Sequence, residues 1–156
     1  MKRQIKFRGK RVDTGEMVFG DLIHGVGSKH GRMYILPITN IYPKGCNELD
    51  GWEVAPDTVG QFTGLLDKNG KEIYEGDIIR VKTCEYDRIG RFYCKTGLPK
   101  YLNACVKYND RSCRYDLVFE QNEYGMISCE IGWGYEEFEV IGNIYDNSEL
   151  LKGGEQ

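Results

Sequence analysis

Six cysteines, two histidines and a group of glutamates are the residues with which this 156-residue chain could do chemistry. The cysteines are Cys46, Cys84, Cys94, Cys105, Cys113 and Cys129. They form no C-x-x-C pair, which a zinc ribbon or a thioredoxin-type site would need. We interpret them as small apolar residues on strands, with disulfides, a metal site or catalysis as the alternatives. We expect reduced thiols, because no apolar segment of a secretory signal follows the basic N-terminus.

The two histidines do not form a recognisable site. His24 and His30 lie around a Gly-rich stretch, and their spacing fits no ligand pair on one face of a helix. A cysteine–histidine nucleophile would have to use one of them. The chain contains no G-x-S-x-G elbow, no P-loop and no dinucleotide-binding glycine fingerprint. We therefore predict no catalytic, cofactor-binding or metal-binding residue, no cofactor, and a protein that is not an enzyme.

Carboxylates gather near the C-terminus, at Glu130, Glu136, Glu137 and Glu139. Glu137 and Glu139 would share one face of a strand, while Phe138 and Val140 occupy the other. A solvated strand face is the simpler interpretation. The alternative is a pair of carboxylates for acid–base or cation-binding work, as in a hydrolase or a cation-dependent enzyme.

Apolar and polar residues alternate with a period of two over much of the chain, which predicts strands. The clearest stretches are 5–8, 17–22, 115–120 and 137–141, and in 17–22 both faces carry apolar residues. Short helical turns are expected near residue 56 and over 148–151. Their candidate caps are Asp57, Thr58, Asn147 and Ser148. The predicted fold class is mainly β, with small barrel-like or folded antiparallel sheets and few short helices.

Residues 63–74 have the pattern of a hairpin. Asp67 can bond the backbone at the start of its turn, and Asn69 and Gly70 tolerate the positive φ that a hairpin demands. A second turn at 74–77 leads into a strand over 78–82. We predict an N-terminal β region over 1–55, a barrel-like β region over 56–152 that carries this hairpin, and a tail over 153–156.

Charge is segregated along the chain, although the formal net charge is only −3. Residues 1–45 carry +6, 46–79 carry −6, 80–114 carry +6 and 115–156 carry −9. Basic blocks at 2–11 and 80–95 could bind nucleic acid, with Tyr86, Phe92 and Tyr93 interleaved for stacking. The candidate contacts are Arg8, Lys10, Arg11, Arg80, Lys82, Arg88 and Arg91. Alternatively, opposite blocks meet within the chain or between subunits, or the charge is ordinary surface charge.

Three separated phrases resemble the YopX-like family of phages and prophages. They are residues 5–10 with 15–20, residues 60–78, and residues 138–147, and together they span almost the whole chain. The resemblance implies a β-rich fold, an unestablished function and no catalytic motif. It also implies the cytoplasm of a bacterial host. We expect no membrane partner, because no stretch approaches the roughly 20 apolar residues that a membrane-spanning helix needs. We expect a protein that self-associates and acts through protein contacts, with an accessory nucleic-acid-binding protein as the alternative.

Overall fold

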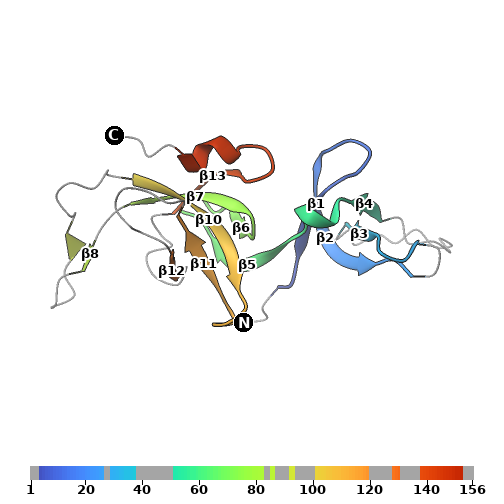
Figure 1. Ribbon diagram of the computed structural model, residues 1–156, viewed down its shortest axis with the longest axis horizontal. Helices are drawn as coiled ribbons and strands as arrows, with labels where there is room; N and C mark the ends of the chain where they lie inside the picture. Colours follow the sequence, from blue (N-terminus) through green and yellow to red (C-terminus); the bar gives the residue numbers. More distant parts are fainter. Residues whose placement is uncertain are drawn as a thin grey trace. The chain divides into compact units, whose positions relative to one another are not determined.

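The computed structural model describes residues 4–26, 29–37, 51–82, 85–86, 92–93, 101–119, 128–130 and 138–152. Its strands are antiparallel, and its helices are short 3-10 turns (Figure 1). The mainly β class predicted from the sequence is therefore confirmed. Over the described residues the sheets stay open instead of closing into a complete barrel. No helix in this described part is long and apolar enough to span a membrane.

The chain divides into two compact units, Met1–Gly64 and Leu65–Gln156. The N-terminal unit contains β1 (Phe7–Lys10), β2 (Met17–His24), β3 (Met33–Leu36), β4 (Trp52–Val54) and the first part of β5 (Gly60–Leu66). These strands are hydrogen-bonded in the order β4-β3-β2-β1-β5. Arg11, just after β1, bridges Val54 of β4, so the sheet curls back on itself. Val18, Ile35 and Val54 form the core on its inner side.

A one-turn 3-10 helix, η2 (Pro56–Thr58), follows β4 at the position predicted for a helical turn. The expected cap residues were wrong here. Ala55 is the N-cap and makes no side-chain capping bond. The Thr58 hydroxyl instead donates to the Ala55 carbonyl at 2.7 Å and accepts the Lys10 N–H at 2.8 Å. Thr58 therefore fastens the helix to β1 across the unit.

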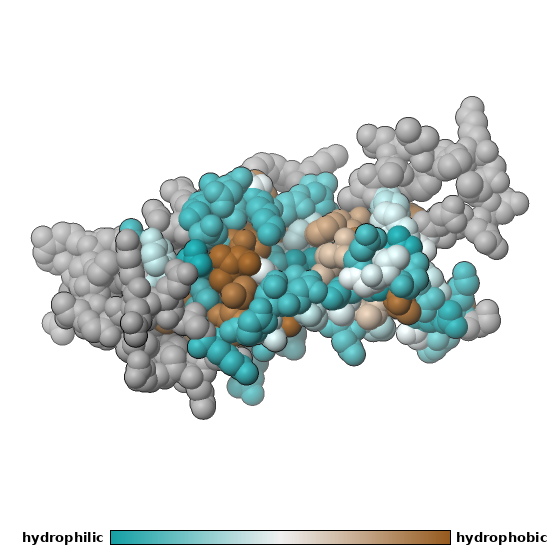
Figure 2. Space-filling model, turned by 90° about the horizontal axis from the view of Figure 1, so that it is seen from above, coloured by the Kyte–Doolittle hydropathy of each residue, from teal (hydrophilic) through white to brown (hydrophobic). Residues whose placement is uncertain are grey.

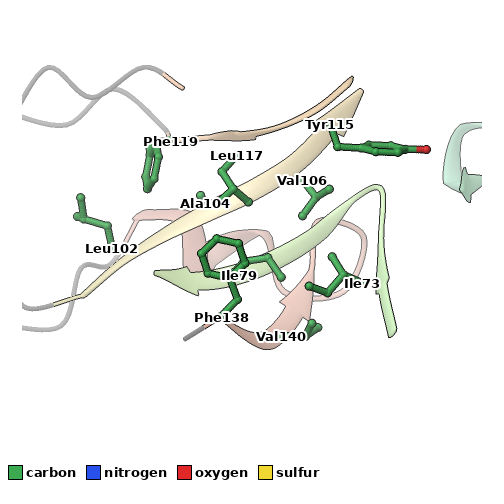
Figure 3. Close-up of a cluster of buried hydrophobic side chains, with 10 residues drawn as sticks. All are labelled: Ile73, Ile79, Leu102, Ala104, Val106, Tyr115, Leu117, Phe119, Phe138 and Val140. Atoms are coloured by element: carbon green, nitrogen blue, oxygen red, sulfur yellow. The ribbon is translucent and has the colours of Figure 1, made fainter. Parts of the chain in front are cut away.

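The C-terminal unit is built around a sheet with the order β12-β11-β10-β7-β13. Its strands are β7 (Asp77–Lys82), β10 (Tyr101–Asn109), β11 (Arg114–Val118), β12 (Ser128–Glu130) and β13 (Glu139–Asn143). A separate pair consists of β8 (Glu85–Tyr86) and β9 (Phe92–Tyr93). Figure 3 shows the buried cluster on one face of the sheet. It comprises Ile73, Ile79, Leu102, Ala104, Val106, Tyr115, Leu117, Phe119, Phe138 and Val140.

The opposite face of this sheet is also partly covered. Ile78 and Cys105, paired across β7 and β10, are almost fully buried there. The 3-10 helix η4 (Ser148–Lys152) packs against β10, and the Asn103 amide donates to the Leu150 carbonyl at 2.7 Å. The predicted C-terminal helical turn is therefore confirmed, and it covers one end of the sheet.

The predicted hairpin is present as the end of β5, a turn, and β6 (Glu72–Tyr74). Gly70 takes the positive φ of +80°. The Asp67 carboxylate accepts N–H bonds from Asn69 at 2.8 Å and Lys71 at 2.9 Å through one oxygen. Its other oxygen accepts the Val140 N–H at 3.1 Å, so the turn is fastened to β13.

The second predicted turn joins β6 to β7. Gly76 has a φ of +82°, and a Cβ there would lie 3.1 Å from the Tyr145 ring. Its N–H donates to the Val106 carbonyl and its carbonyl accepts the Ile144 N–H, both at 2.9 Å. The buried Asp77 accepts the Tyr74 N–H at 2.7 Å. This turn is therefore tied to both β10 and the segment after β13.

Replacing Asp67 with alanine is expected to destabilise the protein by about 3 kcal/mol, because three backbone N–H groups lose one shared acceptor. Chemical denaturation of the two chains measures the change. Asp110→Ala is the matched control, since this exposed turn aspartate should change stability by less than about 0.5 kcal/mol. Equal effects of the two substitutions would contradict the role given to Asp67.

Stability should also depend on the ionisation of Asp67. Burial raises the pKa of this carboxyl, but the N–H bonds from Val140, Lys71 and Asn69 outweigh it, so the pKa lies below its usual value. Between the folded and unfolded pKa values the unfolded chain binds more protons, so acid favours unfolding. The contribution is complete above pH of about 4 and is lost as the pH falls through the folded pKa. Denaturation from pH 6 to pH 2 should therefore show a steeper loss for the native chain than for Asp67→Ala.

Candidate interaction surfaces

The cysteines and histidines do not converge within the part of the chain that the structure describes. Cys105 is buried, Cys113 is exposed, and neither forms a disulfide. His24 and His30 are exposed. No group of three potential metal ligands occurs among the described residues. The side chains of Cys46, Cys84, Cys94 and Cys129 lie outside the description.

One of the four candidate carboxylates is placed, and it forms ion pairs. Glu139 accepts the Lys68 ammonium at 2.7 Å and lies 3.7 Å from the Arg80 guanidinium. The hydrogen bond to Glu139 is the main cause of the raised pKa of Lys68. Glu139 therefore joins the β5–β6 turn to the sheet. The side chains of Glu130, Glu136 and Glu137 are outside the described residues.

The basic residues predicted to contact nucleic acid have different environments in the N-terminal unit. Arg8 is only 5% exposed, so it would have to be uncovered before it could reach a phosphate. Lys10 is half-buried. Arg11 donates twice to the Asp13 carboxylate, at 2.8 and 2.6 Å, and its guanidinium stands 5.6 Å from the centre of the Trp52 ring. The hydrogen bond from Arg11 also holds the pKa of Asp13 below its usual value.

In the C-terminal unit, Arg80 and Lys82 are half-buried on β7. Arg80 lies between Asn103 and Glu139 in the strand register, with the Glu139 carboxylate as an ionic neighbour. Arg88 and Arg91 lie outside the described residues. The five described residues of the predicted set therefore belong to two units, with Arg8, Lys10 and Arg11 in the N-terminal unit and Arg80 and Lys82 in the C-terminal unit.

Residues of opposite charge blocks do meet within the chain. Arg32, from the first basic block, lies 3.2 Å from Glu53 of the first acidic block. Arg80, from the second basic block, lies 3.7 Å from Glu139 of the second acidic block. These two contacts agree with the alternative in which basic and acidic blocks meet within the chain. Part of the segregated charge is therefore neutralised internally.

The outer side of the N-terminal sheet displays a large aromatic side chain. Phe19 lies on β2 directly opposite Arg8 of β1, and it is 49% exposed. Because side chains alternate along β2, Met17, Asp21 and Ile23 lie on the same side as Phe19, opposite to Val18 of the core, and the buried Arg8 of β1 also lies on this side. We call this side the outer face. The sequence contained its signal, because apolar residues occur on both faces of the stretch 17–22.

A pocket at the end of the β10–β11 hairpin was not predicted from the sequence. It has a volume of about 510 Å³. Its lining residues are Lys107, Tyr108, Asn109, Asp110, Arg111, Asp116 and Val118. They come from both strands and from the intervening turn, so only the register of the hairpin brings them together.

These observations describe an all-β protein of two small antiparallel units whose described polar residues mostly serve the fold. The sequence model of the family described as "YopX protein" matches residues 6–152, and the chain therefore belongs to the YopX family. The crystal structure of protein EF1440 from Enterococcus faecalis is similar to it, with 25% sequence identity and a TM-score of 0.52. That alignment covers 96% of this chain and 99% of the other. No curated protein matches the chain.

Because Arg8 is buried, Arg8→Ala should lower the stability of the N-terminal unit by about 2 kcal/mol through lost packing. Thermal unfolding followed by circular dichroism measures the shift in midpoint. Arg11→Ala is the control. Its ion pair with Asp13 is exposed, and such pairs contribute little, so a much smaller shift is expected. A larger shift for Arg11→Ala would show that the burial of Arg8 does not stabilise the unit.

Proposed function

We propose that this YopX-family protein is a non-enzymatic interaction module that self-associates through the outer face of its N-terminal unit. In this proposal it works in the cytoplasm of a bacterial host as a phage or prophage protein. The exposed Phe19 in the middle of β2 is the observation that carries the proposal. When a second surface covers a large exposed aromatic side chain, apolar area is removed from water, which is favourable for association.

The outer face has the composition expected of a modest protein contact. Fully burying a Phe side chain contributes about 2 kcal/mol, so covering the exposed half of Phe19 contributes about 1 kcal/mol in each copy. In a two-fold dimer the same face meets itself, and Phe19 of one copy can pack beside Phe19 of the other. Asp21 and Lys10 supply opposite charges on this face that can pair across the symmetry axis.

Hydrophobic residues also reach the surface elsewhere, so the outer face has to be tested against them. Figure 2 shows brown hydrophobic residues between teal hydrophilic ones on the face that it presents. Ile5, Val12 and Val26 of the N-terminal unit are more exposed than Phe19. They lie outside the described strands, at positions where single exposed apolar residues are ordinary.

The Phe19→Thr variant should weaken self-association while preserving the β-strand preference at this position. Sedimentation velocity at protein concentrations of about 5 to 200 μM measures the average mass, and the native chain is expected to form dimers or larger species over this range, as weak interfaces require. Val26→Thr is the matched control, because Val26 is 82% exposed outside the sheet, and it should associate like the native chain. A monomeric native chain at every concentration, or an unchanged Phe19→Thr variant, would refute the proposal.

A second candidate function is nucleic-acid binding by the N-terminal unit. It is favoured by two cations that stand over half-buried rings: Arg11 over Trp52 at 5.6 Å and Lys29 over Tyr34 at 5.5 Å. Surfaces that combine aromatic rings with cations bind single strands by stacking bases and neutralising phosphates. The internal pairing of Arg11 with Asp13 weighs against this candidate.

Gel-shift titration with a single-stranded oligonucleotide tests the second candidate. Binding at about 50 mM salt should weaken steeply by about 200 mM salt, because basic side chains that bind phosphates release the counterions of the nucleic acid. Lys29→Gln should weaken it, whereas Lys71→Gln, an exposed lysine in the β5–β6 turn, should not. Absence of a shift at low salt would eliminate this candidate and leave the self-association proposal untouched.

A further inference from the structure

The pocket at the end of the β10–β11 hairpin lies on the side of the sheet that faces away from the main core. Lys107 is paired with Asp116 in the register, and Val118 is paired with Cys105. Lys107, Asp116 and Val118 therefore occupy the same face, opposite to Val106 and Leu117 of the buried cluster. Tyr108, Asn109 and the turn residues Asp110 and Arg111 complete the lining.

Hydrogen bonds hold the floor of this pocket in place. The Asn109 amide donates to one Asp116 oxygen at 2.7 Å, and Arg114 donates to the other at 2.9 Å. The side-chain amide oxygen (Oδ1) of Asn109 accepts the backbone N–H groups of Arg111 and Ser112 at 3.1 and 3.3 Å. Asp116 is only 4% exposed, so its carboxylate is a fixed acceptor with lone pairs to spare.

Two basic side chains of the pocket lining make no ion pair with the described part of the chain. Lys107 and Arg111 are exposed, and neither side chain forms an ion pair or a hydrogen bond within the described part of the chain. The charge of Asp116 is already balanced by Arg114. Asp110 adds one exposed carboxylate to the rim. A ligand therefore meets two available cations, one peripheral anion and a buried acceptor.

We propose that this pocket binds a sugar phosphate. The phosphate is held by Lys107 and Arg111, which provide the charged donors that phosphate oxygens prefer. A sugar hydroxyl donates to Asp116, as ribose hydroxyls do to carboxylates in dinucleotide sites. Val118 contacts the apolar edge of the ring. A volume of about 510 Å³ is within the range of small-molecule pockets. The carboxylates of Asp110 and Asp116 disfavour an anion that brings no hydrogen-bond donor.

Calorimetric titration of the full chain with ribose 5-phosphate tests the proposal. Lys107→Gln and Arg111→Gln should each weaken binding roughly tenfold, as the loss of one charged hydrogen bond implies. Lys152→Gln, an exposed lysine on η4 outside the pocket, is the matched control and should bind like the native chain. No binding of ribose 5-phosphate at millimolar concentration, or equal binding by all four chains, would overturn the proposal.

The sugar contact has its own readout. Ribose 5-phosphate should bind more tightly than inorganic phosphate, and Asp116→Asn should reduce that preference. Circular dichroism checks that Asp116→Asn is folded. If it is not, the comparison of the two probes on the native chain decides alone. Equal affinity for both probes, or tighter binding of a poly-glutamate peptide, would overturn the assignment of a sugar phosphate.

The sugar phosphate can come from a free nucleotide or from the end of a nucleic-acid strand. Titration with AMP and with a 5′-phosphorylated oligoribonucleotide separates these sources. Binding of AMP as tight as that of the oligonucleotide assigns the pocket to free nucleotides, and much tighter binding of the oligonucleotide assigns it to strand ends. Because the pocket belongs to the C-terminal unit, these results are independent of the Phe19 assembly test.

Discussion

The carboxylate of Asp67 is the constraint on which the described part of the C-terminal unit depends. It satisfies two N–H groups of its own turn and one of β13, which lies far along the chain. The Lys68 N–H donates to the Phe138 carbonyl beside it, and the Lys68 ammonium pairs with Glu139. The turn thus covers the free edge of β13, which would otherwise expose unpaired backbone groups. A single buried acceptor fixes both a local hairpin and a long-range contact.

The segment 60–78, one of the three that identify the family, therefore holds the strands of the C-terminal unit together. Its first turn is fastened to β13 through Asp67, and its second turn is fastened to β10 through the Gly76 N–H. Gly76 is required there by its positive φ and by the close Tyr145 ring. Turn residues with such demands tolerate little substitution, so these structural demands are enough to produce a recognisable motif.

Local chemistry made this hairpin predictable, while longer-range roles were beyond the sequence. Asp67 and Gly70 have turn preferences that act within a few residues, so the hairpin and the strand after it followed from the printed order. The bond from Val140 to Asp67 depends on tertiary packing, and so does the use of Thr58 as a tie to β1. A cap prediction considers only the helix that follows, which is why it failed at Thr58.

The sequence does not give the solvent exposure of each side chain, and the candidate surfaces depend on that exposure. Arg8 and Lys10 have similar sequence surroundings, yet Arg8 is buried and Lys10 is half-buried, because neighbouring strands decide what covers each side chain. Lys107 and Arg111 looked like ordinary members of a basic block until the hairpin register placed them around Asp116. Since ion pairs such as Arg80 with Glu139 neutralise charge internally, block charge overstates what a partner meets. In the proposed pocket, recognition therefore rests on the few cations left unmatched, and their chemistry, more than the net charge of the chain, would select the ligand.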